Sequence, residues 1–379
     1  MSDIAYRAIQ PGDPAPQFIQ ETSGGPKMVF DFLGGKYTVL CFFATTADAR
    51  GQQMLQVLER GRALFDGNRV FVGVGIDRRD PGIGRLKGEM PGIHFLRDFD
   101  YSVSKLYGIV PENQSTGSIS LRRRYIVLDP NLRIRAVFEP EGDGAEVDKI
   151  LAYVSALPPV DQFPGFHIQA PIIVLPNVFE PDFCRQLIDL HNSGNARETG
   201  FMRDVDGKTV EILDPRHKRR TDYHVEDENL QAIIQQKLAR RVVPEIKKIH
   251  QFDVTRMERF LIGCYDSETG GHFGAHRDNT TMGTAHRRFA VSINLNSEFD
   301  GGEVGFPEYG PQTFKPPAGG AVVFSCSLLH WVSEVKRGKR YAFLPFLYDE
   351  AAAKVRQSNR GFIAKPRVVG TEAEATPAA

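Results

Sequence analysis

Two histidines, one aspartate and one arginine in the second half of the sequence have the types and spacing of a metal-centred site. His276-Arg277-Asp278 is the only His-x-Asp triplet in the chain, and on a strand its outer two residues would point to the same face. An imidazole and a carboxylate that converge suit Fe(II), and a third ligand would complete a facial triad with open positions for small ligands. Alone the triplet is weak evidence, because a His and an Asp at a strand end are ordinarily solvated.

A third metal ligand and an anion partner follow farther along the chain. His330 comes after the apolar run GGAVVFSCS, far enough from Asp278 for several strands to lie between them. Arg340 opens the strand RYAFLPF, where its planar guanidinium could hold a terminal carboxylate through two parallel hydrogen bonds. The alternatives are a core histidine at 330 and a surface arginine in the basic turn KRGKR. The combination of all four residue types on predicted strands favours a site.

Short strands must position these residues. Between Phe260 and Tyr348 the runs FLIGCY, FAVSINL, GGEVGF, GGAVVF and RYAFLPF are separated by Gly, Pro, Asn and Asp clusters. This pattern predicts an antiparallel jelly roll (a double-stranded β-helix) or a barrel, with helices packed outside. Pro181–Asn192 and Glu228–His250 are the expected helices, the second of them bent at Pro244.

The first half of the chain alternates strands and helices instead, which predicts an α/β domain. The expected elements are strands Tyr37–Phe43 and Arg69–Ile76, helices Gln52–Phe65, Ser102–Tyr107 and Val147–Leu157, and a hairpin that starts at Tyr125–Leu128 and turns at Asp129-Pro-Asn131.

A proline-rich stretch, Pro158–Gly165, separates the alternating strands and helices of the first half from the second half. Its prolines predict an extended linker. With 379 residues and roughly 150 residues for a typical domain, two domains are expected. We predict an α/β domain over 1–158, a linker over 159–170, a jelly-roll domain over 171–350 and a polar tail over 351–379.

Composition excludes several classes of function. The 47 basic and 47 acidic residues balance, so no overall field attracts nucleic acid or an anionic membrane. No apolar run is long enough for a bilayer span and the first residues lack a signal-peptide pattern, so a cytoplasmic protein is expected. The four cysteines contain no C-x-x-C pair, which argues against a disulfide scaffold and a thiolate zinc site.

Residues 260–348 resemble the Fe(II)/2-oxoglutarate-dependent dioxygenases, specifically their prolyl-4-hydroxylase-like branch. The matching stretches are CYDSETGGHFGAHRD, NLNSEFDGGEVGFPE, PPAGGAVVFSCSLLH and HWVSEVKRGKR, and residues 171–192 resemble the helical entry of that branch. The resemblance implies that His276, Asp278 and His330 bind iron and that Arg340 and Tyr265 contact 2-oxoglutarate.

The same resemblance implies an enzyme that uses Fe(II), 2-oxoglutarate and O2, with ascorbate as a candidate reductant, and that releases succinate and CO2 as it hydroxylates a substrate. A peptidyl proline, a free amino acid and a small metabolite are all compatible with this interpretation. Asn294 stands where some relatives carry a second tyrosine for the co-substrate carboxylate, so that contact is missing here. Oligomeric state is left open.

The first half resembles a peroxiredoxin or AhpC/TSA-type domain of thioredoxin fold. PGDPAPQF, YTVLCFFATTADARGQQ, FLRDFDYSVSKLYGI and RRRYIVLDPNLRIRAVF carry the likeness over roughly residues 10–157. The segment that should hold the reactive cysteine, Thr45–Gly51, has none, and Cys41 lies inside a buried strand that would raise its thiol pKa. The domain is therefore expected to have a structural or docking role.

Two alternatives to a dioxygenase are a catalytically silent two-domain binding protein and a thiol-dependent peroxidase. The complete set of four site residues argues against the first, and the missing cysteine against the second. The basic run at 216–220 (RHKRR) is expected to be a solvated face, with an acidic substrate as its functional alternative. A second metal site from His217, His224 and Glu226 lacks any further converging ligand.

Overall fold

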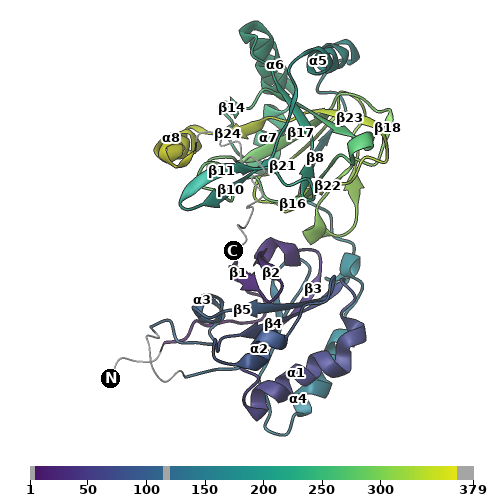
Figure 1. The fold of residues 1–379 in the computed structure, drawn as a ribbon. Coiled ribbons are helices and arrows are strands. Elements are labelled where there is room, and N and C mark those ends of the chain that lie inside the picture. Colours follow the sequence, from purple (N-terminus) through teal and green to yellow (C-terminus); the bar gives the residue numbers. More distant parts are fainter. Residues whose placement is uncertain (1–4, 114–119, 365–379) are drawn as a thin grey trace, which may run out of the picture. The chain divides into compact units, whose positions relative to one another are not determined.

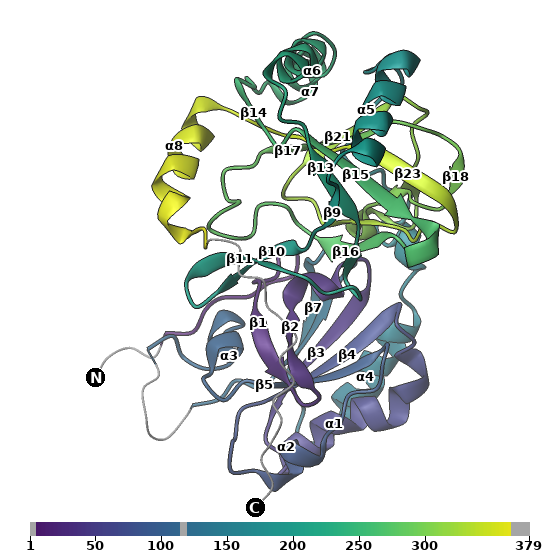
Figure 2. The same ribbon diagram turned by 45° about the horizontal axis from the view of Figure 1, so that its top comes forward.

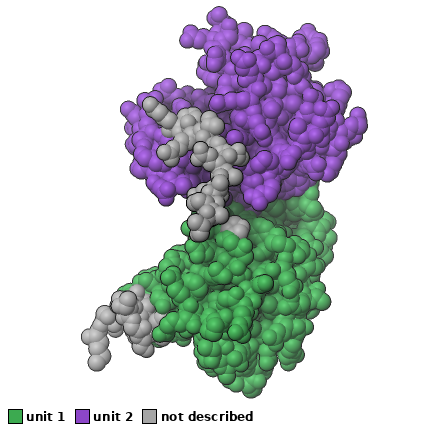
Figure 3. Space-filling model, viewed as in Figure 1, with its two compact units in different colours: residues 1–170, 306–312 green, residues 171–305, 313–379 purple. Residues whose placement is uncertain are grey.

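The computed structural model of the chain describes residues 5–113 and 120–364, which Figure 1 shows as a ribbon. They divide into two compact units, coloured separately in Figure 3. Unit 1 comprises residues 1–170 and 306–312, and unit 2 comprises residues 171–305 and 313–379. Within the described residues, every helix is too short or too polar to span a lipid bilayer.

Unit 1 is built on one seven-stranded mixed sheet with the strand order β2-β1-β5-β4-β3-β6-β7. The central pairs β3–β4 and β4–β5 are parallel, and the outer pairs are antiparallel. Its elements are β1 (Ile19–Thr22), β2 (Gly25–Val29), β3 (Tyr37–Ala44), α1 (Ala49–Gly61), β4 (Arg69–Gly75), α2 (Pro81–Arg85), β5 (Ile93–Arg97), α3 (Ser102–Leu106), β6 (Tyr125–Leu128), β7 (Ile134–Phe138) and α4 (Ala145–Ser155).

Both faces of this sheet are covered, which explains why β3 is apolar along its whole length. Alternate residues of a strand face opposite sides. Val39 and Phe43 pack with α1 and α4, whereas Leu40 and Phe42 belong to a second cluster that includes Val103 of α3. The two layers of helix are visible in Figure 1. The predicted α/β thioredoxin-like architecture is confirmed.

All four cysteines are buried and free, and burial raises the pKa of each thiol. A thiol without a stabilising cation in an apolar strand is unreactive. We therefore expect an alkylating reagent to label the native protein at least about 1,000-fold more slowly than the unfolded chain. Mass spectrometry of pulse-labelled protein measures this difference. Rapid native labelling of Cys41 together with thiol-dependent peroxide consumption would contradict it.

The stretch Pro158–Gly165 differs from the extended linker expected from its prolines. It contains a short 3-10 helix, Val160–Gln162, and Phe163 is buried in the α1/α4 side of the unit 1 core. The carbonyl of Phe163 also accepts a hydrogen bond from Arg135 at 3.2 Å. Burial of one aromatic ring thus ties this segment to unit 1.

Unit 2 contains two antiparallel sheets and a separate hairpin, β10–β11. The large sheet runs β14-β24-β17-β23-β15-β13-β9, with β8, β18 and β21 joined to it, and the small sheet runs β12-β16-β22-β19-β20. The strands are β8 (Ile173–Leu175), β9 (Arg197–Glu198), β10 (Phe201–Val205), β11 (Lys208–Ile212), β12 (Lys218–Arg219), β13 (Thr221–His224), β14 (Arg256–Glu258), β15 (Leu261–Asp266), β16 (His272–His276), β17 (Phe289–Asn294), β18 (Phe299–Asp300), β19 (Val304–Gly305), β20 (Thr313–Phe314), β21 (Ala321–Ser325), β22 (His330–Val332), β23 (Arg337–Phe343) and β24 (Phe346–Tyr348).

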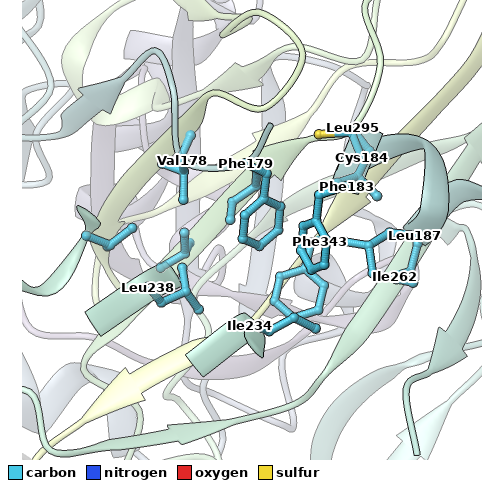
Figure 4. Packing of buried hydrophobic residues seen from close by; sticks show 14 of the residues in the cluster. Val178, Phe179, Phe183, Cys184, Leu187, Ile234, Leu238, Ile262, Leu295 and Phe343 are labelled. Atoms are coloured by element: carbon cyan, nitrogen blue, oxygen red, sulfur yellow. The ribbon is translucent and has the colours of Figure 1, made fainter. Parts of the chain in front are cut away.

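Helices cover the outer face of the large sheet, as predicted for a jelly roll with flanking helices (Figure 2). Phe183 and Leu187 of α5 (Pro181–Ser193) and Ile234 of α6 (Glu228–Arg241) pack against strand residues such as Phe343, as Figure 4 shows. The bend expected at Pro244 is a break, after which α7 (Val243–His250) begins with that proline in its first turn.

Regular structure continues beyond residue 350, where a polar tail was expected. Helix α8 (Glu350–Ser358) is capped by the Asp349 carboxylate, which accepts a hydrogen bond from the Ala352 N–H at 2.9 Å. The part of the expected tail from residue 365 onward lies outside the described residues.

Candidate metal centre

The structure brings His276 and His330 together on neighbouring strands of the small sheet. His276 is the last residue of β16 and His330 is the first of β22, and the two are direct partners in the antiparallel register. Their ring centroids lie 4.2 Å apart. Pairing across a sheet therefore joins two residues that are 54 positions apart in the chain.

Asp278 lies beyond the end of β16, not on the strand as expected. Its backbone N–H donates to the Cys326 carbonyl at 3.0 Å, so the chain leaves the β22 ladder directly after His276. The carboxylate still converges on both imidazoles, because its oxygens lie 3.6 Å from His276 Nε2 and 3.4 Å from His330 Nε2. One donor atom from each of the three residues lies within 4.8 Å of the others.

Backbone carbonyls hold both imidazoles in the tautomer that a metal requires. His276 Nδ1 lies 2.8 Å from the Gly274 carbonyl, and His330 Nδ1 lies 3.0 Å from the Leu328 carbonyl. A carbonyl can only accept, so each Nδ1 carries the proton and each Nε2 keeps its lone pair toward Asp278. The sequence could not reveal these partners, since any residue supplies a carbonyl.

The charge states of the cluster suit a cation. Burial, followed by the neighbouring His276, lowers the pKa of His330 to about 4, so its imidazole is neutral near pH 7. Burial would raise the pKa of Asp278, but the neighbouring His330 and His276 hold it well below its usual value. Two imidazole nitrogens and one carboxylate are the donor set of a facial triad.

Arg340 lies in the middle of β23, not at its start, and its side chain is almost completely buried. Its Nη2 donates to Ser292 Oγ at 2.7 Å and its Nε donates to Asn294 Oδ1 at 3.0 Å. Its Nη1 is buried without a hydrogen-bond partner among the described residues. A buried cationic donor without a partner is costly, so this atom indicates an anion that is held here.

Tyr265 faces the same guanidinium. It is paired with Arg340 in register between β15 and β23, and the Arg340 Cζ lies 5.3 Å from the centre of its ring. Gly302, at φ +69°, approaches the arginine so closely that an added Cβ would lie 3.0 Å from Arg340 Cδ. This close approach accounts for the second glycine of the pair in the motif FDGGEVGF.

An apolar cluster connects the arginine pocket with the histidines. Tyr265, Phe273 and Phe299 pack together with Val332 and Val335. The Phe273 ring stacks on His276, with centroids 3.6 Å apart and an angle of 18° between the planes. This apolar cluster thus contacts His276 through Phe273 and Arg340 through Tyr265.

The basic run at 216–220 is only partly the solvated face that we expected, because Arg216 and Arg219 are exposed but two of its residues are not. Lys218 and Arg220 are buried, and Arg220 donates to both carboxylate oxygens of Asp222, at 2.6 and 2.8 Å. Arg220 Nη1 also donates to the Tyr265 hydroxyl at 3.2 Å. The i, i+2 spacing of Arg220 and Asp222 could have indicated this ion pair, because residues two apart in extended backbone face the same side.

The buried Asp222 carboxylate gives a stability prediction. Burial would raise its pKa, but Arg220 and Lys218 hold it below the usual value. Asp222→Asn leaves these cations uncompensated, so we expect the free energy of unfolding to fall by about 3 kcal/mol near pH 7. Denaturant titration measures this loss, with the exposed Asp300→Asn as control, for which no comparable loss is expected.

The pH dependence of this effect follows from the direction of the shift. A carboxylate whose folded-state pKa is depressed stabilises the fold fully above its unfolded pKa of about 3.9, and this contribution decreases as the pH falls. The difference between the wild type and Asp222→Asn should therefore shrink in acid. An equal loss at pH 7 for Asp222→Asn and Asp300→Asn would contradict the buried-pair interpretation.

The other histidines of this region have different positions. His217, which the sequence suggested only as part of a second metal site, packs its ring 4.5 Å from Phe201 and 6.4 Å from His276, measured between centroids. His224 is exposed on β13. Among residues 5–113 and 120–364, the structure brings no second group of three metal-ligating side chains together.

Known proteins resemble both units. The sequence model of the 2OG-Fe(II) oxygenase superfamily matches residues 260–348. A PKHD-type hydroxylase of Synechococcus sp. is 36% identical over 89 residues, which are 22% of this chain and 39% of that protein. One of Cupriavidus metallidurans is 29% identical over 187 residues, 45% of this chain and 75% of that protein. The crystal structure of peroxidoxin BcpB of Mycobacterium tuberculosis covers 40% of this chain and 99% of its own, at 18% identity and a TM-score of 0.34.

The chain spans 39% of the length of the Synechococcus relative, and the matched residues contain the whole cluster described above. The residues fit the metal and the co-substrate of the superfamily. Two imidazoles and one carboxylate converge, and the guanidinium that faces Tyr265 has a buried nitrogen without a partner among the described residues.

Proposed function

We propose that this chain, whose residues 260–348 form a 2OG-Fe(II) oxygenase domain, is a hydroxylase that uses Fe(II), 2-oxoglutarate and O2 and releases succinate and CO2. The observation that carries the proposal is the convergence of three donor atoms within 4.8 Å, with the buried Arg340 Nη1 left without a hydrogen-bond partner among the described residues. A catalytically silent binding protein would need neither the three converging donor atoms nor the unpartnered guanidinium nitrogen.

Bound Fe(II) and 2-oxoglutarate would supply the oxidation of the substrate C–H bond by O2. The chain would hold the metal through the Nε2 atoms of His276 and His330 and one oxygen of Asp278. Arg340 would orient 2-oxoglutarate by pairing with its distal carboxylate. The apolar wall of Phe273 and Val332 would exclude water, which keeps reactive species from solvent.

Tyr265 has a hydroxyl that accepts from Arg220, so its own proton is available for donation to the co-substrate. We expect Tyr265→Phe to raise the KM for 2-oxoglutarate about 3- to 15-fold, the effect of one hydrogen bond. Succinate formation at varied 2-oxoglutarate concentration measures the change. Tyr348→Phe, which alters a buried tyrosine at the other end of the large sheet, should leave this KM unchanged. An unchanged KM in Tyr265→Phe would show that the Tyr265 hydroxyl does not contact 2-oxoglutarate.

The substrate that becomes hydroxylated is a small molecule or a peptide. His217, whose ring lies next to His276, and Phe201, which packs on His217, are the side chains that we expect to contact the substrate. The relatives are named PKHD-type hydroxylases, which supports hydroxylation as the reaction but does not select among a peptidyl proline, a free amino acid and a metabolite.

Binding and turnover together test the proposal. Protein kept free of O2 should bind one Fe(II) and, with iron present, one 2-oxoglutarate in calorimetric titrations. Admission of air with ascorbate should produce succinate, and a screen of peptides and metabolites should find the compound that accelerates it. A protein that binds neither iron nor 2-oxoglutarate would be the silent scaffold that is the alternative.

A further inference from the structure

We propose that unit 1 binds a small oxyanion, a phosphate or carboxylate group, in a cavity lined by arginines. The cavity measures about 500 Å³, and its walls are Arg50, the run 121–124 (LRRR), Glu139 and Pro140. This volume lies within the range of about 300 to 1,000 Å³ that small-molecule sites occupy.

The fold places these residues around one end of the sheet. Arg50 lies in the first turn of α1, directly after β3, whereas 121–124 lead into β6 and Glu139 follows β7. Because β3, β6 and β7 are neighbours, with Cys41 opposite Tyr125 and Tyr125 opposite Phe138, three distant segments converge. Arg50 belongs to Thr45–Gly51, the segment in which a peroxiredoxin-like domain would hold its thiol and which here contains no cysteine.

The guanidinium groups of the cavity are only partly neutralised. Arg124 donates to Glu139 at 2.8 Å, and Arg123 Nη2 contacts the Asp48 carboxylate. Arg50 and Arg122 form no ion pair with any described residue. Four arginines against Glu139 and the adjacent Asp48 leave a net charge of +2.

A buried donor also lacks its partner. The Arg123 side chain is 12% exposed, and its Nε is buried with no hydrogen-bond partner in the part of the chain that the structure describes. The Arg122 guanidinium rests on the Tyr6 ring, 3.7 Å from its centre, which limits its motion. Clustered, pre-oriented guanidinium forks with free N–H groups are the arrangement that recognises phosphate and carboxylate groups.

Calorimetric titration of the full-length, iron-free protein with inorganic pyrophosphate and, separately, with citrate tests this site. We expect saturable binding of one of them with a Kd below about 1 mM at low ionic strength, and the preferred probe tells phosphate from carboxylate chemistry. In Arg50→Gln/Arg122→Gln the affinity should fall at least 10-fold. Neither residue is in an ion pair with the described chain, so the fold should be retained.

Two control variants show whether the probe binds in this cavity. Arg79→Gln/Arg85→Gln changes two exposed arginines of unit 1 and removes the same net charge, so its affinity should stay within 2-fold of the wild type. Arg340→Gln, which alters the proposed 2-oxoglutarate site, should also retain the wild-type affinity for the probe. Equal weakening in the two double variants, loss in Arg340→Gln, or no saturable binding of either probe would overturn the proposal. Because no iron is present, the outcome is independent of the proposed hydroxylase activity.

Discussion

His276→Ala is expected to abolish succinate formation, with a loss of at least about 1,000-fold in kcat/KM. The substitution removes one of three metal-directed atoms from a cluster in which all three lie within 4.8 Å. Two remaining ligands hold Fe(II) weakly, and the stacked Phe273 ring, 3.6 Å from the imidazole, offers no replacement donor. Metal analysis after gel filtration should find less than one tenth of the iron that the wild type retains.

His224→Ala is the matched control for this experiment. His224 is exposed on β13 and makes no contribution to the cluster, so iron content and turnover should remain within 2-fold of the wild type. Circular dichroism of both variants checks that the fold is unchanged. Full iron retention by folded His276→Ala would show that the iron is bound elsewhere.

Arg340→Gln is expected to raise the KM for 2-oxoglutarate by about 100-fold or more, which corresponds to the loss of a charge-assisted, bidentate interaction of about 3 kcal/mol. The guanidinium has Ser292 and Asn294 on two of its nitrogens and a third nitrogen without a partner in the described chain, so it is fixed in place before an anion arrives. Such pre-orientation makes the interaction strong. Steady-state kinetics at saturating Fe(II) measure the change.

Arg337→Gln is a stringent control, because Arg337 lies on the same strand but is exposed and forms its ion pair with Asp300. Its KM for 2-oxoglutarate should not change. Arg340→Lys should recover only part of the affinity, since an ammonium group cannot reproduce the planar fork. A KM in Arg340→Gln within 2-fold of the wild type would refute the assignment of this pocket to the co-substrate carboxylate.

Local sequence patterns determined the two architectures and most elements of this protein. The apolar run of β3 predicted a strand buried on both faces, and the turn-separated runs after Phe260 predicted antiparallel strands. These predictions succeed because strand and turn preferences act within a few residues. The expectation for Pro158–Gly165 failed, because whether Phe163 is buried depends on α1 and α4, far from it in the chain.

For the candidate metal centre, residue types and spacing indicated His276, Asp278, His330 and Arg340. Tertiary structure decided how they meet. Strand register sets His276 opposite His330, and the exit of the chain from β16 brings Asp278 to both. The carbonyls of Gly274 and Leu328 that fix the imidazoles are main-chain atoms, and no side-chain pattern reports them.

The charged residues show most clearly which properties the sequence determines and which only the tertiary structure decides. The sequence determined that five basic residues stand together at 216–220 and three at 122–124. Only the fold decided that Lys218 and Arg220 are buried against Asp222, while Arg122 and Arg123 join Arg50 around a cavity. The reason is physical: the free energy of a charge depends on the partners and solvent around it, and those are set by elements distant in the chain.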